Sequence, residues 1–128
     1  MGIFITDNDT VDVSFFVGAV DNEMLCVETE AEAKDKFKEN AFEKHFISFK
    51  KMNYGTMKKV QAACMQESDG KFIFNPLRFR AERFMQSIKK WSFKDAAGNT
   101  VPISSQTIDS LSDVVANFLI DLFERKTG

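Results

Sequence analysis

Apolar residues recur every three or four positions in two long stretches of this sequence, and this spacing constrains the fold more than any other feature. In the C-terminal stretch the repeat runs through Leu111, Val114, Val115, Phe118, Leu119 and Leu122. In residues 76–91 it runs through Leu77, Ala81, Phe84, Ile88 and Trp91. Such spacing places the apolar side chains on one face of an amphipathic helix. Both stretches are therefore predicted to be helices that cover a core.

Residues that cap helices mark further helix starts. Thr29 precedes a stretch with apolar residues at 33, 37 and 41, which predicts a helix over 30–44. Asn53 opens a helix that ends near residue 66, before the turn at 67–70 and a short apolar lead-in at 71–74. Asn75-Pro76 starts the helix that ends near Trp91, and Ser104-Ser105 caps a short segment to Leu111. The prediction is a mainly α (α+β) protein with four to five helices.

The extended segments are expected to be minor. Short apolar runs at 3–5 and 11–20, broken by turn-forming Asp and Asn residues, predict a short N-terminal β arm or hairpin. Minor strands are expected near 46–50 and 91–103, with Pro102 confining the second to a sheet edge. We predict an N-terminal β arm over 1–28, able to exchange between subunits, and a single helical domain over 29–128.

Phenylalanine is the main core-filling residue, since the chain has 14 Phe and only five Leu. Large aromatic side chains bury much area with few rotatable bonds, so a Phe-rich core explains this composition. Trp91 is expected to be buried at the end of its helix, against the last helix. The predicted core consists of Leu77, Phe84, Ile88, Trp91, Leu111, Val115, Phe118 and Leu122.

Charge is distributed unevenly along the chain, although the net charge is only −2. Residues 1–43 carry three lysines against eleven acidic residues, and residues 44–94 carry twelve basic against three acidic residues. Such segregation fits an anionic partner or acidic and basic elements packed together in one fold, and we favour the second. The candidate partner-binding residues are Arg78, Arg80, Arg83, Lys89 and Lys90.

The sequence offers no catalytic or metal-binding constellation. His45 is the one histidine, and Cys26 and Cys64 lack the spacing of a zinc site or a disulfide framework. No nucleotide-binding or hydrolase motif occurs. The prediction is a protein that is not an enzyme, needs no cofactor and holds no metal. No apolar run reaches the length of a membrane span, so we expect no membrane partner.

Nucleic-acid binding is a separate hypothesis, because the segment 71–94 is basic with interleaved aromatic residues. We do not favour it, since Phe84 and Trp91 share the apolar stripe and should be buried. The sequence isoelectric point near 5.4 also opposes nonspecific attraction to phosphate.

The second half of the chain carries an ordered set of short motifs. These are Ile47-Ser48-Phe49-Lys50-Lys51-Met52-Asn53-Tyr54-Gly55, then Trp91-Ser92-Phe93, Asp95-x-x-Gly98, Val101-Pro102-Ile103 and Ile108-Asp109-x-Leu111. Over residues 46–124 this succession resembles the tail assembly chaperones of tailed bacteriophages. The resemblance implies binding of the tape-measure protein until tail tube subunits polymerise around it, with no catalytic residues. Residues 1–28 fall outside the resembling pattern.

Three functions follow as hypotheses. The first is a non-enzymatic phage tail assembly factor that binds other tail proteins, namely the tape-measure protein or the tail tube, and that self-associates. The second is a structural virion component of the tail, neck or baseplate. The third is a small nucleic-acid-binding regulator that uses the basic segment 71–94. The first implies a location in the host cytoplasm, and the second a location in the virion.

Overall fold

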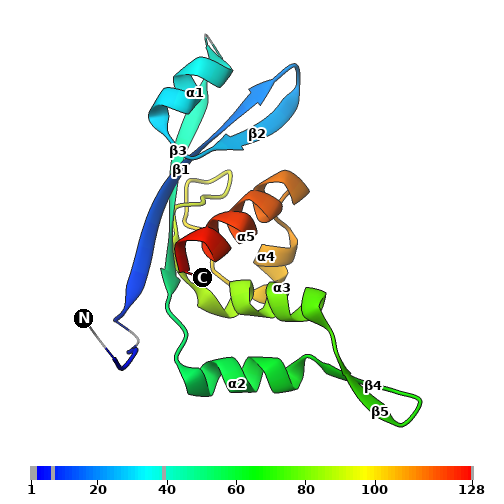
Figure 1. The fold of residues 1–128 in the computed structure, drawn as a ribbon. Coiled ribbons are helices and arrows are strands. Elements are labelled where there is room, and N and C mark those ends of the chain that lie inside the picture. Colours follow the sequence, from blue (N-terminus) through cyan, green and yellow to red (C-terminus); the bar gives the residue numbers. More distant parts are fainter. Residues whose placement is uncertain (1–2, 7, 39, 128) are drawn as a thin grey trace.

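The protein is an α+β fold, as a computed structural model that describes residues 3–6, 8–38 and 40–127 shows (Figure 1). Within these residues six strands form two antiparallel sheets, and five helices accompany them. The prediction of a mainly helical domain is therefore wrong. The strands are β1 (Thr10–Val20), β2 (Glu23–Val27), β3 (Phe42–Lys50), β4 (Met65–Ser68), β5 (Lys71–Phe74) and β6 (Ile88–Trp91). The helices are α1 (Glu30–Phe37), α2 (Tyr54–Ala63), α3 (Pro76–Ser87), α4 (Ser105–Asp109) and α5 (Asp113–Thr127).

The N-terminal strand is central to the larger sheet, which has the strand order β2-β1-β3-β6. β1 pairs with β3 from Thr10 opposite Lys50 to Gly18 opposite Phe42. It also forms a hairpin with β2, closed by the turn at Asp21 and Asn22, which both have positive φ angles. Such a turn matches the twist of the paired strands. β1 is thus no appended arm, and the sheet joins strands from both sides of the boundary predicted at residue 28.

Two predicted helices end earlier than their apolar spacing suggests. α1 stops at Phe37 because Lys38 takes a positive φ of 52°, and the chain then enters β3 at Phe42. α3 stops at Ser87, and the next four residues form β6, which pairs with β3 through Ile47 opposite Trp91. In both cases pairing with a distant strand overrides local helical spacing.

The helix starts are those that the capping residues predict. The side chains of Thr29, Asn53, Asn75 and Ser104 accept hydrogen bonds from the backbone amides of α1, α2, α3 and α4. These bonds satisfy amide groups that have no partner inside the helix. Helix starts are local events, which is why the sequence alone specifies them.

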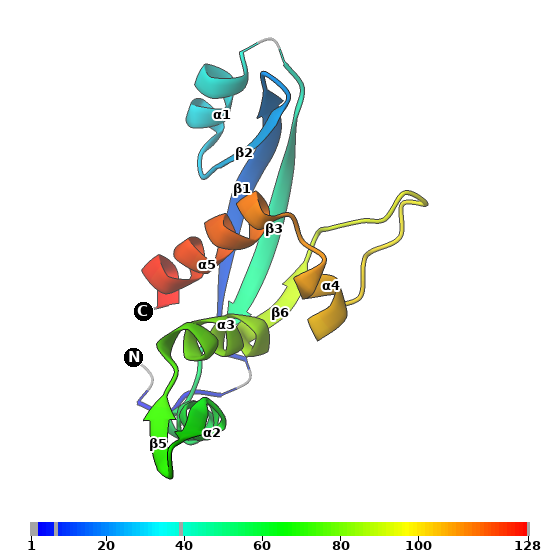
Figure 2. The ribbon, with the colours of Figure 1, turned by 90° about the vertical axis from the view of Figure 1, so that its right-hand side faces the viewer.

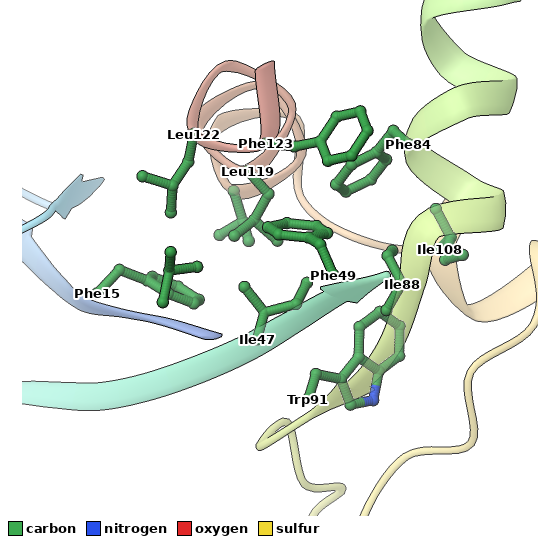
Figure 3. Close-up of a cluster of buried hydrophobic side chains, with 12 residues drawn as sticks. Phe15, Ile47, Phe49, Phe84, Ile88, Trp91, Ile108, Leu119, Leu122 and Phe123 are labelled. Atoms are coloured by element: carbon green, nitrogen blue, oxygen red, sulfur yellow. The ribbon is translucent and has the colours of Figure 1, made fainter. Parts of the chain in front are cut away.

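A larger core fills the space between one face of the sheet and helices α3 and α5 (Figure 3). Phe15, Ile47 and Phe49 project from the strands toward Leu119 and Leu122 of α5. Phe123 packs against Phe49 and Phe84, with ring centroids 5.1 and 6.2 Å away. α5 is therefore the main cover of the sheet.

The predicted core residues fall into three groups. Phe84, Ile88, Trp91, Val115 and Leu122 are buried, whereas Leu111 and Phe118 are partly buried against the same cluster. Leu77 was predicted to be buried but is 79% exposed, because it lies in the first turn of α3 beyond the reach of α5. Trp91 belongs to β6 rather than to a helix, and its indole N–H donates to the Val101 carbonyl at 2.7 Å.

A smaller core lies under α1 and contains Phe16, Val27, Ala33 and Phe37. Phe15 belongs to the larger core and Phe16 to the smaller one, so both faces of β1 are covered at these two residues, whereas Asp12 and Ser14 on the Phe16 face are exposed. The sequence alternates over residues 11–15 and loses the alternation at Phe16, where the second face is also buried. Gly18 lets the Phe37 ring approach the strand backbone, since a Cβ atom there would lie 2.7 Å from the ring.

The long strands β1 and β3 connect two ends of the molecule. α1 and the β1–β2 turn lie at one end, and α2 with the β4–β5 hairpin lies at the other, in both views (Figures 1 and 2). Helices α3, α4 and α5 occupy the middle. The two ends therefore offer separate surfaces.

Candidate functional site

The β4–β5 hairpin projects from the end of the molecule between α2 and α3 (Figure 1). Asp69 and Gly70 form its turn with φ angles of 53° and 75°, and Ser68 faces Lys71 across it. An Asp-Gly turn with two positive φ angles favours a two-residue hairpin connection. We call this hairpin, residues 65–74, the arm.

The arm exposes apolar side chains along most of its length. Phe72 is 72% exposed and Ile73 is 53% exposed, and Met65 and Phe74 are also exposed. Cross-strand pairing puts Phe72 and Phe74 on the same side of the hairpin as Met65. An isolated two-stranded hairpin is marginally stable in water, and among the described residues no third strand joins this one. Its apolar side is therefore suited to contact with another chain.

Only the base of the arm is fixed to the rest of the protein. The Phe74 ring packs against Phe79 of α3 at 5.2 Å, and the Asn75 amide donates to the Cys64 carbonyl at 2.9 Å. Behind the base, Val60 and Cys64 of α2 are buried. The direction in which the arm leaves the protein is thus set, while its outer half contacts solvent.

Exposed basic side chains occur in the arm and on the two helices that flank it in the sequence, although the arm itself carries Glu67 and Asp69 against Lys71. Lys58 and Lys59 on α2, Lys71 on β5 and Arg78 on α3 are exposed. The Lys58 ammonium lies 5.3 Å from the centroid of the exposed Tyr54 ring, a cation–π contact. Over residues 50–79 six basic residues oppose two acidic ones, a net charge of +4.

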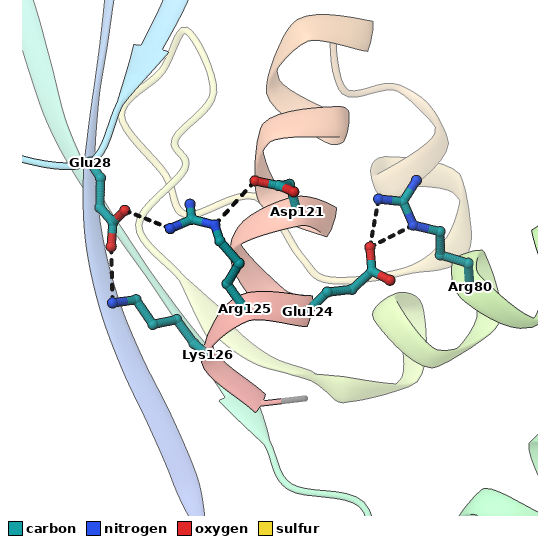
Figure 4. A network of polar contacts seen from close by, with 6 residues as sticks. All are labelled: Glu28, Arg80, Asp121, Glu124, Arg125 and Lys126. Atoms are coloured by element: carbon teal, nitrogen blue, oxygen red, sulfur yellow. Dashed lines mark hydrogen bonds and ion pairs between the residues drawn. The ribbon is translucent and has the colours of Figure 1, made fainter.

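The five predicted partner-binding residues do not form one surface. Arg78, Arg80 and Arg83 belong to α3, whereas Lys89 and Lys90 lie on the edge strand β6. Arg80 binds Glu124 of α5 through its Nε at 2.6 Å (Figure 4). The Arg83 guanidinium lies over the rings of Phe79 and Phe123, at 5.5 and 5.6 Å. Two of the three arginines are thus held by contacts inside the protein.

A second ion-pair group links α5 to the end of β2 (Figure 4). The Glu28 carboxylate binds Lys126 and Arg125, each at 3.0 Å, and Arg125 also reaches Asp121 at 3.2 Å. Hydrogen bonds from Lys126 and Arg125 hold the pKa of Glu28 below its ordinary value. These contacts pair the acidic N-terminal third with basic residues near the C-terminus, and Arg80 and Glu124 pair the basic middle with the acidic end.

The aromatic residues of the basic segment are placed unevenly. Phe84 and Trp91 are buried, so neither can stack on a nucleic-acid base. Phe72 and Phe74 of the arm are exposed, and sequence reasoning missed them by treating 71–74 as a lead-in to a helix. The signal that could have found the arm is Asp69-Gly70 between two short extended runs.

His45 joins two strands of the sheet through hydrogen bonds. Its Nδ1 lies 3.2 Å from the Ser92 hydroxyl and its Nε2 lies 3.0 Å from the Glu43 carboxylate. The Ser92 hydroxyl also accepts the Phe46 amide N–H at 2.9 Å. The group therefore ties the segment after β6 to β3.

The two cysteines are separate thiols. Cys64 is buried and Cys26 is half-buried, and neither is bonded to the other. Burial raises the pKa of the Cys26 thiol to about 11. Over residues 3–6, 8–38 and 40–127 no group of three or more His, Cys, Asp or Glu residues could hold a metal ion. No helix in the described part of the chain is long and apolar enough to cross a membrane.

Comparison with known proteins gives no relative for this chain: no family model, no curated protein and no solved structure matches it.

Proposed function

We propose that this protein is a non-enzymatic assembly factor that binds other proteins through the arm, and that its partners are tail proteins of a tailed bacteriophage. The observation that carries the binding role is the exposed apolar side of the β4–β5 hairpin. The phage partners, the tape-measure protein or the tail tube, rest on the resemblance of residues 46–124 to tail assembly chaperones.

The physical case for binding concerns solvation. Exposed apolar surface that gathers on one element marks an interaction site more often than scattered apolar residues do. The arm holds Met65, Phe72, Ile73 and Phe74 in ten consecutive residues. Burying one such large side chain against a partner contributes about 1.5–3 kcal/mol. Three or four of them contribute about 4.5–12 kcal/mol, which is comparable to the about 4–15 kcal/mol that association costs in lost freedom, so the rest of the interface must supply further contacts.

The arm also suits the partner that the resemblance implies. A tape-measure protein would present long helices, and an apolar helix face can lie against an apolar hairpin as it would in a groove. Lys58 and Lys59 on the neighbouring helix α2 would favour a helix whose polar side is acidic.

The test is coexpression with the tape-measure protein encoded by the same phage genome, followed by affinity measurement. Phe72→Ser with Met65→Ser should weaken binding at least tenfold, since both exposed side chains lie on the apolar side of the arm and lose their contact. Val114→Ser is the matched control, because Val114 is 45% exposed on α5, away from the arm. Unchanged binding by the double variant, with circular dichroism like that of the unaltered protein, would contradict the proposal.

Mass spectrometry of purified virions separates the assembly factor from a structural component of the tail, neck or baseplate. An assembly factor should be absent from finished particles. A structural component would be present in a number that matches a symmetry of the tail.

A further inference from the structure

A hollow of about 190 Å³ lies between the end of β3 and helices α3 and α5. Lys50, Lys51, Arg83, Ser87 and Thr127 are among the residues that line it. A smaller hollow of about 70 Å³ shares both lysines and Ser87 with it and reaches the start of α2, which lies beside α3 in both views (Figures 1 and 2). None of the arm residues 65–74, all of which the structure describes, lines either hollow.

Two buried polar atoms at the larger hollow have no hydrogen-bond partner among the described residues. They are the Ser87 Oγ and the Arg83 Nε. Ser87 is only 1% exposed, so its hydroxyl has lost its contact with bulk water. Proteins leave few buried polar atoms unpaired, because such an atom gives up its bonds to water and gains nothing in return. Both atoms belong to residues that line the hollow, so a group inside it can accept a hydrogen bond from each.

The charge around the two hollows is positive. Lys50, Lys51 and Arg83 line them, and in the described part of the chain no aspartate or glutamate does. Asp9 accepts the Lys51 amide N–H with its backbone carbonyl, whereas its carboxylate accepts the Thr6 amide N–H at 2.8 Å. Cations gathered in this way repel one another. An anion between them would turn the repulsion into attraction.

Aromatic rings hold the Arg83 side chain in place. The carbon at the centre of its guanidinium lies 5.5 Å from the centroid of the Phe79 ring and 5.6 Å from that of the Phe123 ring. Such contacts orient the guanidinium without using its N–H donors. Arg80, on the same helix, is instead bound to the Glu124 carboxylate. Arg83 is therefore a positioned cation whose donors are available to a ligand.

The start of α2 adds to the positive character. Asn53 and Thr56 line the smaller hollow, and the Asn53 side chain accepts the Thr56 amide N–H at 2.9 Å. The first amides of a helix have no partner within the helix, and the helix dipole places partial positive charge at this end. A helix start alone is not specific for a ligand, but here it lies beside the unpaired Ser87 hydroxyl.

We propose that this hollow binds a small oxyanion of the phosphate class. The Ser87 hydroxyl and the Arg83 guanidinium donate hydrogen bonds to its oxygens, and Lys50 and Lys51 add charge through their flexible side chains. Pockets for drug-sized ligands have volumes of about 300–1,000 Å³, so a hollow of about 190 Å³ suits one phosphate group and not a whole nucleotide. The site lies outside the arm, so the inference goes beyond the proposed function.

Titration of inorganic phosphate into the ¹⁵N-labelled full chain tests the site by NMR. Sodium chloride keeps the ionic strength constant, which removes general screening from the comparison. The amide signals of residues 50–55 and 83–87 should shift together and saturate with one dissociation constant. Methyl phosphate should act as inorganic phosphate does. A short single-stranded oligonucleotide that binds the same residues more tightly than either would overturn the assignment to a small ligand.

Two variants test which side chains hold the anion. Ser87→Ala should weaken phosphate binding at least tenfold, because a hydrogen bond to a charged acceptor is lost. Lys51→Gln should weaken it roughly two- to fivefold, since an exposed charge contributes less. Ser14→Ala and Lys36→Gln are the matched controls, because both residues are exposed and line neither hollow.

Thermal denaturation separates a ligand-binding serine from a structural one. Without phosphate, Ser87→Ala should have a Tm no lower than that of the unaltered protein, because the change removes a buried hydroxyl that has no partner. Phosphate should raise the Tm of the unaltered protein and of both controls, and should raise that of Ser87→Ala much less.

Three outcomes would overturn the inference. Phosphate could cause no saturable shift beyond that of chloride, the shifts could spread over lysines throughout the chain, or folded Ser87→Ala could bind phosphate as the unaltered protein does. Each of these would leave the binding of a tail protein through the arm unaffected, because Phe72 and Met65 line neither hollow. Failure of this site and failure of the proposed function are therefore distinguishable.

Discussion

Replacing Gly18 by alanine tests the packing of α1 on the sheet. Gly18 lies in β1 opposite Phe42, and the ring of Phe37 rests directly on its backbone. An added Cβ would lie 2.7 Å from two ring carbons and 2.9 Å from a third. Phe37 is fully buried, so its ring has little room to move away. The methyl group should therefore force α1 from its position.

The magnitude follows from two opposing effects. An ordinary carbon–carbon contact is about 3.5 Å, so the ring or the strand must shift by about 0.8 Å. Overpacking of this kind costs about 1–3 kcal/mol. Alanine also restricts the unfolded chain relative to glycine, which offsets about 0.4–1 kcal/mol. The net expectation is a loss of about 1–2 kcal/mol, or a fall of about 4–8 °C in Tm for a chain of this size.

Thermal denaturation followed by circular dichroism measures the effect. Gly55→Ala is the matched control, because Gly55 lies in α2 with only one atom near its added Cβ, at 3.6 Å, and alanine there should raise stability by about 0.5–1 kcal/mol. In a double-mutant cycle, Gly18→Ala should cost less in a Phe37→Leu background, since the smaller side chain leaves space for the methyl. A Gly18→Ala protein as stable as the unaltered one would refute the packing of Phe37 on β1.

Four further predictions concern the core and the titrating groups. Leu77→Ser should change stability by less than about 0.5 kcal/mol, because the side chain is exposed, whereas Phe84→Ala on the same helix should cost about 3–5 kcal/mol in urea denaturation. The native fluorescence of Trp91 should be blue-shifted and should move to the red on unfolding, because the residue is 4% exposed; a water-like native emission would contradict its place in the core. Burial gives the Cys26 thiol a pKa of about 11 in place of 9.0. Because the thiolate is the nucleophile, this thiol should react with an alkylating reagent at pH 8 about a hundredfold more slowly than an unperturbed thiol. A rate like that of a free thiol would show that Cys26 is open to solvent. The pKa of Glu28 is lowered in the folded protein, so its contribution to stability is present at neutral pH and is lost as the pH falls through the lowered pKa. Glu28→Gln should therefore lower the free energy of unfolding by less than about 1 kcal/mol at pH 7 and not at all in strong acid. An equal loss at both pH values would exclude an ionic origin of this contribution.

Local chemistry in the sequence predicts where helices begin but not where they end. Asn75 and Pro76 are sufficient to start α3, because a side-chain oxygen and a fixed φ act within three residues. The end of α3 depends on the pairing of Ile88–Trp91 with β3, some forty residues earlier in the chain. Helical spacing from Leu77 to Trp91 continues across the boundary between α3 and β6. The sequence holds no local signal that separates the helix from the strand.

The sequence-based prediction underestimated the lengths of strands β1 and β3 for a related reason. Thr10–Val20 has Phe15 and Phe16 side by side, and each belongs to a different core. Strands with one buried side show alternation, and β1 alternates only over residues 11–15 before Phe16 adds a second buried side. Its neighbour β3 became a short minor strand in the prediction because the apparent helix over 30–44 took in its first residues.

Of the candidate site, the sequence predicted only the basic charge. The basic character of residues 71–94 is plain from the sequence, but which cations face solvent depends on α5, whose Glu124 holds Arg80. The arm was not predicted, because the significance of its Asp-Gly turn depends on the strands beside it. Exposure is a property of the assembled fold, so Phe72 and Phe84 look alike in the sequence and differ in the structure.

The position of α5 at the end of the chain has a consequence for synthesis. Strands β1 and β3 leave the ribosome early, yet the side of the sheet that carries Phe15 and Phe49 gains its cover only when Leu119 to Phe123 have been made. During translation the nascent sheet therefore presents bare aromatic rings, a state prone to aggregation. A stop codon before residue 113 should produce insoluble fragments, even though it leaves every strand intact.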